Sequence, residues 1–299
     1  MEKEITSSSE PESRYCTSLN EAVNTLLKTV CTTQQKQEKN DSLKTGFGNL
    51  EFYDKELIIL AARPYIGKSA FVLSMIKQIC LDSKQSVGLI IPGNIDDTKV
   101  SEKLISTCSQ IPSAKIRYPA ALDDEKITKL QDAAKKITEA PLYVMNIPNC
   151  SLSDIKISIN SMVEKSAKLI VIEGFEFLKE IVDSDQKWYR EDLEHMLVHL
   201  KYFAEGFTVP ILVVMDLPWT EDDYEPRLTD FKKYMIIPRT ADKVLFIFRD
   251  QLRDEVLYQD AKVQDAKVVI AKNNNGEVGD IHILFHPATN SFIYSENLE

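Results

Sequence analysis

The chain contains 299 residues, of which 43% are hydrophobic and 27% are charged, a composition typical of a soluble globular protein. Its formal net charge of −10 argues against a broadly basic nucleic-acid-binding surface, although a local basic channel is compatible with it. The five cysteines are scattered, with no C-x-x-C pair, which indicates reduced thiols rather than a zinc site or a disulfide framework. Because the sequence lacks a long apolar run and a signal peptide, we expect a cytoplasmic protein without membrane association.

The N-terminal region differs from the remainder of the chain. Residues 1–17 are polar and rich in Ser and Glu, so we expect a disordered tail. Residues 18–42 are expected to form a linker helix and a polar tether. Ser18 is a candidate N-cap with Glu21 three residues later, and apolar residues recur at helical spacing as far as Val30. This helix can bury its apolar face either on another part of this fold or on a neighbouring subunit.

Residues 43–299 are expected to form one domain in which strands and helices alternate. Strands are predicted at 57–62, 87–91, 142–145, 169–172, 211–215, 244–248, 267–271, 281–285 and around 292. Helices are predicted at 68–81, 97–110, 123–138, 151–165 and 186–205. Continuous apolar strands that alternate with helices predict the α/β class, with a mostly parallel sheet flanked by helices. The last strands follow one another without helices, so we expect an antiparallel extension at the C-terminal end.

The segment 57–69, LIILAARPYIGKS, follows the phosphate-binding pattern G-x-x-x-x-G-K-S/T except that Ala62 replaces the first glycine. A strand, a tight loop and a helix in this order direct backbone N–H groups and the positive helix end at one spot. Lys68 is expected to contact the β- and γ-phosphates of a nucleotide, and Ser69 to ligate Mg²⁺. The other residues expected to line the phosphates are Arg63, Pro64, Tyr65, Ile66 and Gly67. The alternative is a chance GKS in a strand-to-helix turn.

Glu173 follows the predicted strand 169–172 directly. A carboxylate at the end of a buried strand is costly unless it faces a cation or solvent. Glu173 is therefore a candidate metal ligand beside Ser69, and the alternative is a solvated strand-end carboxylate.

Together these motifs resemble the C-terminal, RecA-like ATPase domain of DnaB-type replicative DNA helicases. The matching segments are Thr45-Gly46-Phe47, ELIILAARPYIGKSAF, LIVIEGFEFL, VPILVVMDL, TADKVLFIFRD and AKNNNGEVGDIHILF. The resemblance runs from about residue 19 to residue 285, and the family's N-terminal helical domain is missing from the match. The family also carries Ala at the position of Ala62, so this departure from the pattern is the family's own.

The resemblance implies a RecA-like P-loop NTPase that uses ATP and Mg²⁺ and takes part in DNA replication. It implies a hexameric ring in which helix 18–30 docks on the adjacent subunit, and single-stranded DNA and other replication proteins as partners. Lys272 corresponds to a family lysine that reaches the neighbour's nucleotide. The loop that faces DNA corresponds to residues 227–239, where Arg227, Lys232, Lys233 and Arg239 are interleaved with Phe231 and Tyr234. Such a mixture can hold phosphates and stack bases, and the alternative is a solvated loop.

Several residues differ from the family at the positions that act in ATP hydrolysis. The glutamate that activates water is replaced by Asn94, whose amide cannot accept a proton at neutral pH. The metal-binding aspartate is Glu173, the glutamine sensor is Asp216, and the arginine that reaches into the neighbour is Asn274. Asp96 and Asp97 lie near Asn94 and are open either as substitutes or as caps of the next helix. Lys68 and Glu173 are the remaining candidates for catalytic groups.

Three hypotheses follow. The first is a DnaB-like ATP-binding protein of DNA replication with weak or no hydrolysis. The second is an active 5′-to-3′ DNA helicase with relocated catalytic groups, and the third is an interaction module that no longer binds nucleotide. Whether the protein is an enzyme therefore stays open at the level of sequence.

Overall fold

The computed structural model describes residues 23–24, 27–28, 42–93, 97–148, 150–178, 190–217, 224–249 and 263–295. The chain divides into two units, residues 1–41 and 42–299, and each is described by itself. In the first unit the described residues, 23–24 and 27–28, are helical. Apart from Ser42, the remainder of the predicted tail, linker helix and tether lies outside the described residues. In the part of the chain that is described, no helix is long and apolar enough to cross a membrane.

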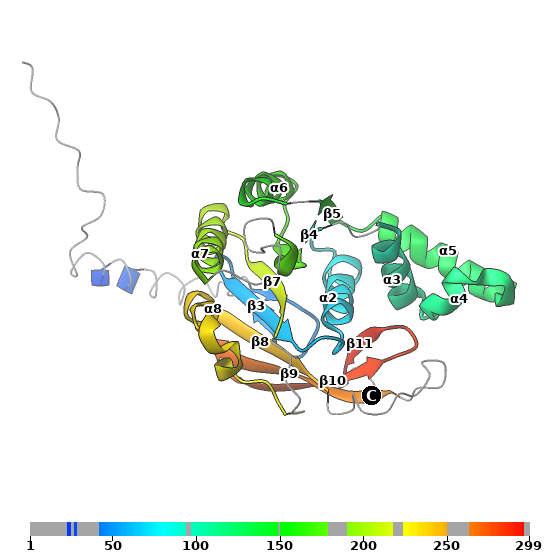
Figure 1. Cartoon of the computed structure of the whole chain (residues 1–299). Coiled ribbons are helices and arrows are strands. Elements are labelled where there is room, and N and C mark those ends of the chain that lie inside the picture. The colour runs from blue at the N-terminus through cyan, green and yellow to red at the C-terminus, as the bar shows by residue number, and fades with distance from the viewer. Residues whose placement is uncertain are drawn as a thin grey trace, which may run out of the picture. The chain divides into compact units, whose positions relative to one another are not determined.

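The second unit is built around a large sheet, which within the described residues has nine strands in the order β11-β10-β9-β8-β3-β7-β6-β4-β5 (Figure 1). Its strands are β3 (Leu57–Ala62), β4 (Val87–Pro92), β5 (Leu142–Ile147), β6 (Leu169–Glu173), β7 (Ile211–Asp216), β8 (Lys243–Phe248), β9 (Gln264–Asn273), β10 (Gly279–His286) and β11 (Ser291–Tyr294). The strands from β8 to β5 in this order are parallel, and β9, β10 and β11 are antiparallel to their neighbours. The predicted mostly parallel sheet with an antiparallel C-terminal extension is confirmed. A separate two-stranded ribbon is formed by β1 (Leu43–Lys44) and β2 (Glu51–Phe52).

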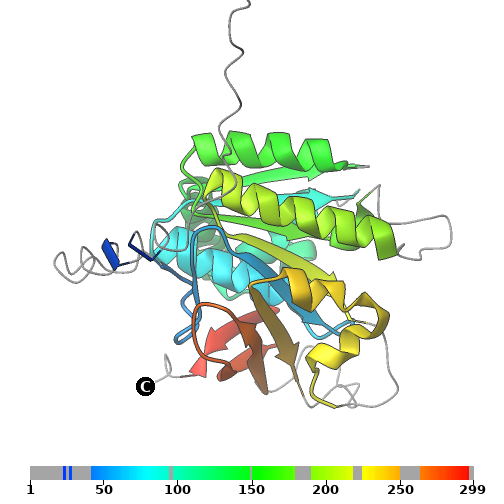
Figure 2. The same cartoon turned by 90° about the vertical axis from the view of Figure 1, so that its left-hand side faces the viewer.

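Helices cover both faces of the sheet. In the described part of the chain the helices are α2 (Lys68–Lys77), α3 (Asp97–Ser109), α4 (Ser113–Arg117), α5 (Asp124–Thr138), α6 (Leu152–Glu164), α7 (Arg190–Phe207) and α8 (Ile236–Thr240). Short 3-10 turns lie at η2 (Pro119–Ala121), η3 (Phe175–Phe177) and η4 (Leu228–Tyr234), and a π-helical turn, η1 (Gln78–Asp82), follows α2. Helices α6 and α7 run side by side over one face, as Figure 2 shows, while α2 lies on the other.

The sequence of β3 explains this two-sided cover. All six of its residues are buried. Ile58, Leu60 and Ala62 belong to the core beneath α2, whereas Leu57, Ile59 and Ala61 belong to the core beneath α6 and α7. Because successive side chains of a strand point to opposite faces, a strand without polar residues requires an apolar layer on each side. The central position of β3 in the sheet follows from that requirement.

Element boundaries differ from the sequence-based expectation at a few places. The predicted helix 68–81 is α-helical only to Lys77 and then widens into η1. The strand predicted at 267–271 is longer, because β9 pairs along its length with β10. The short helices α4 and α8 were not predicted, since five residues are too few to show helical periodicity. The start of the helix predicted at 186 lies outside the described residues.

The two ends of the parallel strands define two edges of the sheet. We call the end at which β3, β6, β7 and β8 finish the carboxyl edge, and the end at which they start the amino edge. Residues Ala62, Glu173 and Asp216 lie at the carboxyl edge, and Leu57 and Lys243 lie at the amino edge. In open parallel sheets ligands bind at the carboxyl edge.

Candidate nucleotide-binding site

The loop between β3 and α2 is a tight turn with two left-handed residues. Tyr65 has φ 67° and Gly67 has φ 110°, and the Ile66 N–H donates to the Arg63 carbonyl at 3.4 Å. A Cβ atom at Gly67 would lie 3.1 Å from Cε2 of Phe292. Glycine is therefore required at position 67 both by the backbone conformation and by the ring packed against it.

Helix α2 begins directly after this turn, at Lys68, with Gly67 as its N-cap. No side chain caps the first turn, so its backbone N–H groups are directed at the loop without a side-chain acceptor. The Gly67 carbonyl accepts from the Phe71 N–H at 2.9 Å, and Ser69 is half-buried in the first turn. A helix N-terminus of this kind attracts anions, through both its N–H groups and its dipole.

Lys68 is paired with a carboxylate of the neighbouring strand. Strand β7 lies next to β3, in a register that sets Asp216 opposite Ala62. The Lys68 ammonium donates to Oδ1 of Asp216. The side chain of Lys68 is 14% exposed and that of Asp216 is 42% exposed. The pair therefore sits at the surface of the carboxyl edge, open to water on the side of the aspartate.

Glu173 ends β6, the strand on the far side of β7 from the loop. Its register partner in β7 is Val214, two residues before Asp216, and Glu173 is half-buried. Among the described residues no group of three or more His, Cys, Asp or Glu side chains could hold a metal ion. Mg²⁺ is commonly held by one or two protein oxygens together with water and phosphate oxygens, and Ser69 and Glu173 can supply oxygens of that kind.

Two buried arginines fix the loop to the remainder of the domain; each is 7% exposed. The Arg63 guanidinium donates to the Tyr224 carbonyl at 2.8 Å and lies 4.4 Å from the centre of the Tyr224 ring. Arg249 donates to the Tyr65 carbonyl at 3.0 Å and stacks 4.1 Å from the ring centre of Phe285. Arg249 was not predicted as a site residue, although it lies in the segment TADKVLFIFRD that carried the resemblance. The Tyr65 side chain itself is 90% exposed.

Comparison with known proteins bears on this geometry. The family model of the DnaB-like helicase C terminal domain matches residues 41–294. The chain belongs to this family. Among curated relatives, the replicative DNA helicase DnaB of Rickettsia typhi is 25% identical over 283 residues, which is 84% of this chain and 56% of the relative. That of Geobacillus stearothermophilus is 25% identical over 267 residues, covering 86% of this chain and 57% of the relative. The chain thus spans little more than half the length of the curated relatives it matches.

Solved structures share the fold. One of them, described as an ATPase domain, superimposes with a TM-score of 0.77 at 22% identity, covering 92% of this chain and 98% of that domain. A DnaB-like replicative helicase, solved for its interactions with primase, gives 0.78 at 21% identity and covers 93% of this chain and 67% of that protein. The RecA-like fold inferred from the sequence is confirmed, as is the resemblance to DnaB-type helicases.

Lys272 does not lie at the loop between β3 and α2 of the same chain. Lys272 pairs with Val244 in β8, toward the amino edge of the sheet, and donates to the carbonyls of Pro238 and Ala241 at 3.0 and 2.5 Å. Asn274, at the position of the family arginine, donates to Oδ1 of Asp242 at 3.3 Å. Both side chains lie at the end of the sheet opposite to Lys68, so within this chain neither can contact a nucleotide held there.

The predicted DNA-facing segment has exposed cations but one buried ring. Arg227, Lys232 and Arg239 are exposed, and the side chain of Lys233 is outside the described residues. Phe231 is 2% exposed and packs 5.7 Å from the Phe246 ring centre. The expectation that Phe231 stacks on bases was therefore wrong, because this ring belongs to the core beneath α7 and α8.

The position of the expected water-activating residue is outside the described part of the chain. Asn94 and Asp96 belong to the residues that the structure does not describe, and Asp97 is the first residue of α3, with its side chain also outside the description. The substitution of Asn94 for glutamate stays a prediction from the sequence.

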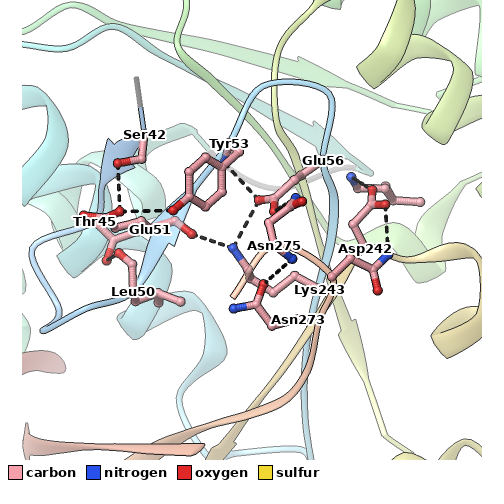
Figure 3. A network of polar contacts seen from close by, with 12 residues as sticks. Ser42, Thr45, Leu50, Glu51, Tyr53, Glu56, Asp242, Lys243, Asn273 and Asn275 are labelled. Atoms are coloured by element: carbon pink, nitrogen blue, oxygen red, sulfur yellow. Dashed lines mark hydrogen bonds and ion pairs between the residues drawn. The ribbon is translucent and has the colours of Figure 1, made fainter. Parts of the chain in front are cut away.

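A buried polar network occupies the amino edge and was not anticipated from the sequence (Figure 3). The Lys243 ammonium lies 3.1 Å from the Glu56 carboxylate, and both side chains are 2% exposed. Lys243 also donates to the Glu51 carbonyl at 2.5 Å. Glu56 accepts from the Tyr53 N–H at 2.9 Å and from the Asn275 amide at 2.6 Å. Burial lowers the pKa of Lys243, and the charge of Glu56 opposes that shift.

Proposed function

We propose that this chain is a DnaB-like ATP-binding protein that acts in DNA replication and hydrolyses ATP weakly. The observation that carries the proposal is the contrast within one site. Gly67, Lys68 and an uncapped helix N-terminus form a cradle suited to phosphate. The group beside Lys68 is the carboxylate of Asp216, where the family has an uncharged glutamine. The loop thus retains groups that can hold a polyphosphate, whereas the carboxylate of Asp216 stands where the family has a neutral side chain and opposes the approach of the γ-phosphate.

Binding is assigned to residues of the loop and of the neighbouring strand ends. The loop backbone and Lys68 would hold the phosphates of ATP, and Ser69 and Glu173 would ligate Mg²⁺, whose chemistry is to neutralise charge on the β- and γ-phosphates. Arg249 keeps the loop in shape through its bond to the Tyr65 carbonyl. A loop held in advance loses less conformational entropy when it binds a ligand.

Weak hydrolysis is inferred from groups that cannot perform their family roles. Asn94 can orient a water molecule but cannot take its proton. Asn274 carries an amide, bonded to Asp242, and thus cannot place a positive charge on a neighbour's nucleotide. A positive charge that acts mainly in the transition state can contribute several orders of magnitude to turnover.

An active 5′-to-3′ DNA helicase is the second candidate. It is favoured by the relatives, which are named replicative DNA helicases, and by the carboxylate of Glu173 at the end of β6. Strand separation on a forked DNA substrate tests it. Absence of unwinding, both alone and with added replication proteins, would remove this candidate.

Assembly and DNA binding are proposed by analogy with the family. Helix 18–30 would clasp the adjacent subunit of a hexamer, and Lys272 would reach that subunit's nucleotide. Single-stranded DNA would contact Arg227, Lys232, Lys233 and Arg239, and the protein would work in the cytoplasm. Removing residues 1–42 and measuring the mass in solution tests the clasp, because an unchanged oligomer would exclude it.

Equilibrium dialysis of the full chain with ATP and Mg²⁺ tests the proposed function. We expect saturable binding in the micromolar range that is lost in Lys68→Ala. Binding that survives this substitution contradicts the proposed site. Failure of the unaltered protein to bind would instead support a module that works without nucleotide.

A further inference from the structure

We propose that Asp216 competes with the nucleotide phosphates for Lys68, and that it thereby makes ATP binding by this chain strongly dependent on a divalent cation. This inference rests on the proposed nucleotide-binding function and deepens it. It concerns a carboxylate that the family pattern does not contain and that the sequence alone assigns only to a sensor position.

The backbone holds Asp216 at the cradle. Ala62 is its register partner in β3, and the N–H of the next residue, Leu217, donates to the Ala62 carbonyl at 2.9 Å. Met215 and Leu217, on either side of Asp216, are buried at 0% and 2% exposure. With its neighbours anchored in the core, Asp216 can move its carboxylate only by side-chain rotation and cannot withdraw from the loop.

Lys68 is the cation that pairs with the carboxylate of Asp216. The two arginines at the loop are engaged elsewhere, since Arg63 binds and stacks on Tyr224 and Arg249 binds Tyr65 and Gln264. An arriving phosphate must therefore share the Lys68 ammonium with Asp216 or draw it away. The gain from the new contact is reduced by the weakening or loss of the existing one.

The exchange also leaves two like charges together. Once Lys68 turns to phosphate, the carboxylate of Asp216 stands beside a polyanion at the same edge of the sheet. Repulsion over such a distance is substantial in a partly buried site, but water and salt reduce it because the Asp216 side chain is 42% exposed. A divalent cation on the phosphates offsets this repulsion, whereas metal-free ATP has no such compensation.

The test compares ATP affinity of the full chain with Mg²⁺ and with EDTA, by equilibrium dialysis. Asp216→Asn keeps the shape and removes the charge. In EDTA we expect this variant to bind ATP roughly tenfold more tightly than the unaltered protein, and with Mg²⁺ less than about threefold more tightly. Asp216→Glu retains the charge, so its affinity should stay within about threefold of the original in both buffers.

Asp132→Asn is the matched control, because it makes the same change in net charge at an exposed position of α5 and should leave both affinities unchanged. The inference is overturned if Asp216→Asn binds metal-free ATP no more tightly than the unaltered protein, or if the gain is equally large with Mg²⁺. Failure of the proposed function looks different, since then none of these proteins binds ATP in either buffer, and the inference falls with it.

Discussion

The two edges of the sheet each carry a lysine–carboxylate pair, and the pairs differ in how they are embedded. At the amino edge, Lys243 and Glu56 are both 2% exposed. At the carboxyl edge, Lys68 is 14% and Asp216 is 42% exposed. The first pair is buried at the amino edge, and the second lies beside the loop between β3 and α2. The lysine–carboxylate pair at the amino edge is thus a fixed structural contact, whereas the pair at the carboxyl edge can be exchanged for contacts with a ligand.

The difference lies in the number of additional partners. Lys243 also binds the Glu51 carbonyl, and Glu56 also accepts from Tyr53 and Asn275. Withdrawing one member would leave the other charged and unpaired out of reach of water. Asp216 faces solvent, so water can replace Lys68 at low cost. The exposure of the side chains to solvent therefore determines which of the two ion pairs a ligand can separate.

Breaking the buried pair should have the largest effect. We expect Lys243→Met to lower the free energy of unfolding by about 3–5 kcal/mol, because it leaves Glu56 buried without its cation. Urea unfolding followed by circular dichroism measures this change. Lys99→Met, at an exposed position of α3, is the control and should change stability by less than about 0.5 kcal/mol. If Lys243→Met lowers the free energy of unfolding by less than about 1 kcal/mol, the buried network contributes little to stability.

A substitution that strains the loop between β3 and α2 should have the second largest effect. Gly67→Ala forces a side chain onto a residue with φ 110° and against the Phe292 ring, so we expect a loss of about 1–3 kcal/mol in stability together with weaker ATP binding. The matched control is Gly206→Ala in α7, where nothing lies within 4 Å of the added methyl group. That change should stabilise the domain by about 0.5–1 kcal/mol. Equal effects at the two glycines would contradict the role given to the turn.

Removing the exposed lysine should separate binding from stability. Lys68→Ala is expected to abolish ATP binding and yet change the free energy of unfolding by less than about 1 kcal/mol, because its partner Asp216 is solvated. Dialysis and urea unfolding on the same preparation measure both quantities. Destabilisation as large as that of Lys243→Met would show that the two edges do not differ as described.

The smallest expected effect is a pH dependence at the carboxyl end of β10. Burial lowers the pKa of His286 below its usual 6.5, and its Nε2 is buried with no hydrogen-bond partner in the described part of the chain. The unfolded chain then binds the proton more readily. Stability from this group is thus present above about pH 6.5 and is lost as the pH falls below it. Thermal midpoints at pH 7 and pH 5 should differ less in His286→Gln than in the unaltered protein, and an unchanged difference would exclude His286 as the source.

The sequence was sufficient to predict the sheet, its flanking helices and the tight turn from β3 into α2. These features depend on local patterns, namely apolar runs such as 57–62 and the motif at 67–69. Contacts between distant segments could not be read in the same way. Lys68 and Asp216 are 148 residues apart in the chain, and Lys243 and Glu56 are 187 apart, so their pairing depends on strand order and register.

Short irregular segments were the other source of error. Phe231 lies in the seven-residue turn η4, where no periodicity distinguishes a buried ring from an exposed one. The role of Lys272 stays a prediction, because the resemblance assigns it to the nucleotide of a neighbouring subunit, and in this chain it lies toward the amino edge.

The measurement that tests the central claim most directly is phosphate release from ATP by the full chain, with and without single-stranded DNA, beside Lys68→Ala. We expect ATP to be bound but phosphate to be released very slowly, with little stimulation by DNA. Turnover of about 1 s⁻¹ or faster, as in ordinary enzymes, that is stimulated by DNA and abolished by Lys68→Ala would contradict this expectation.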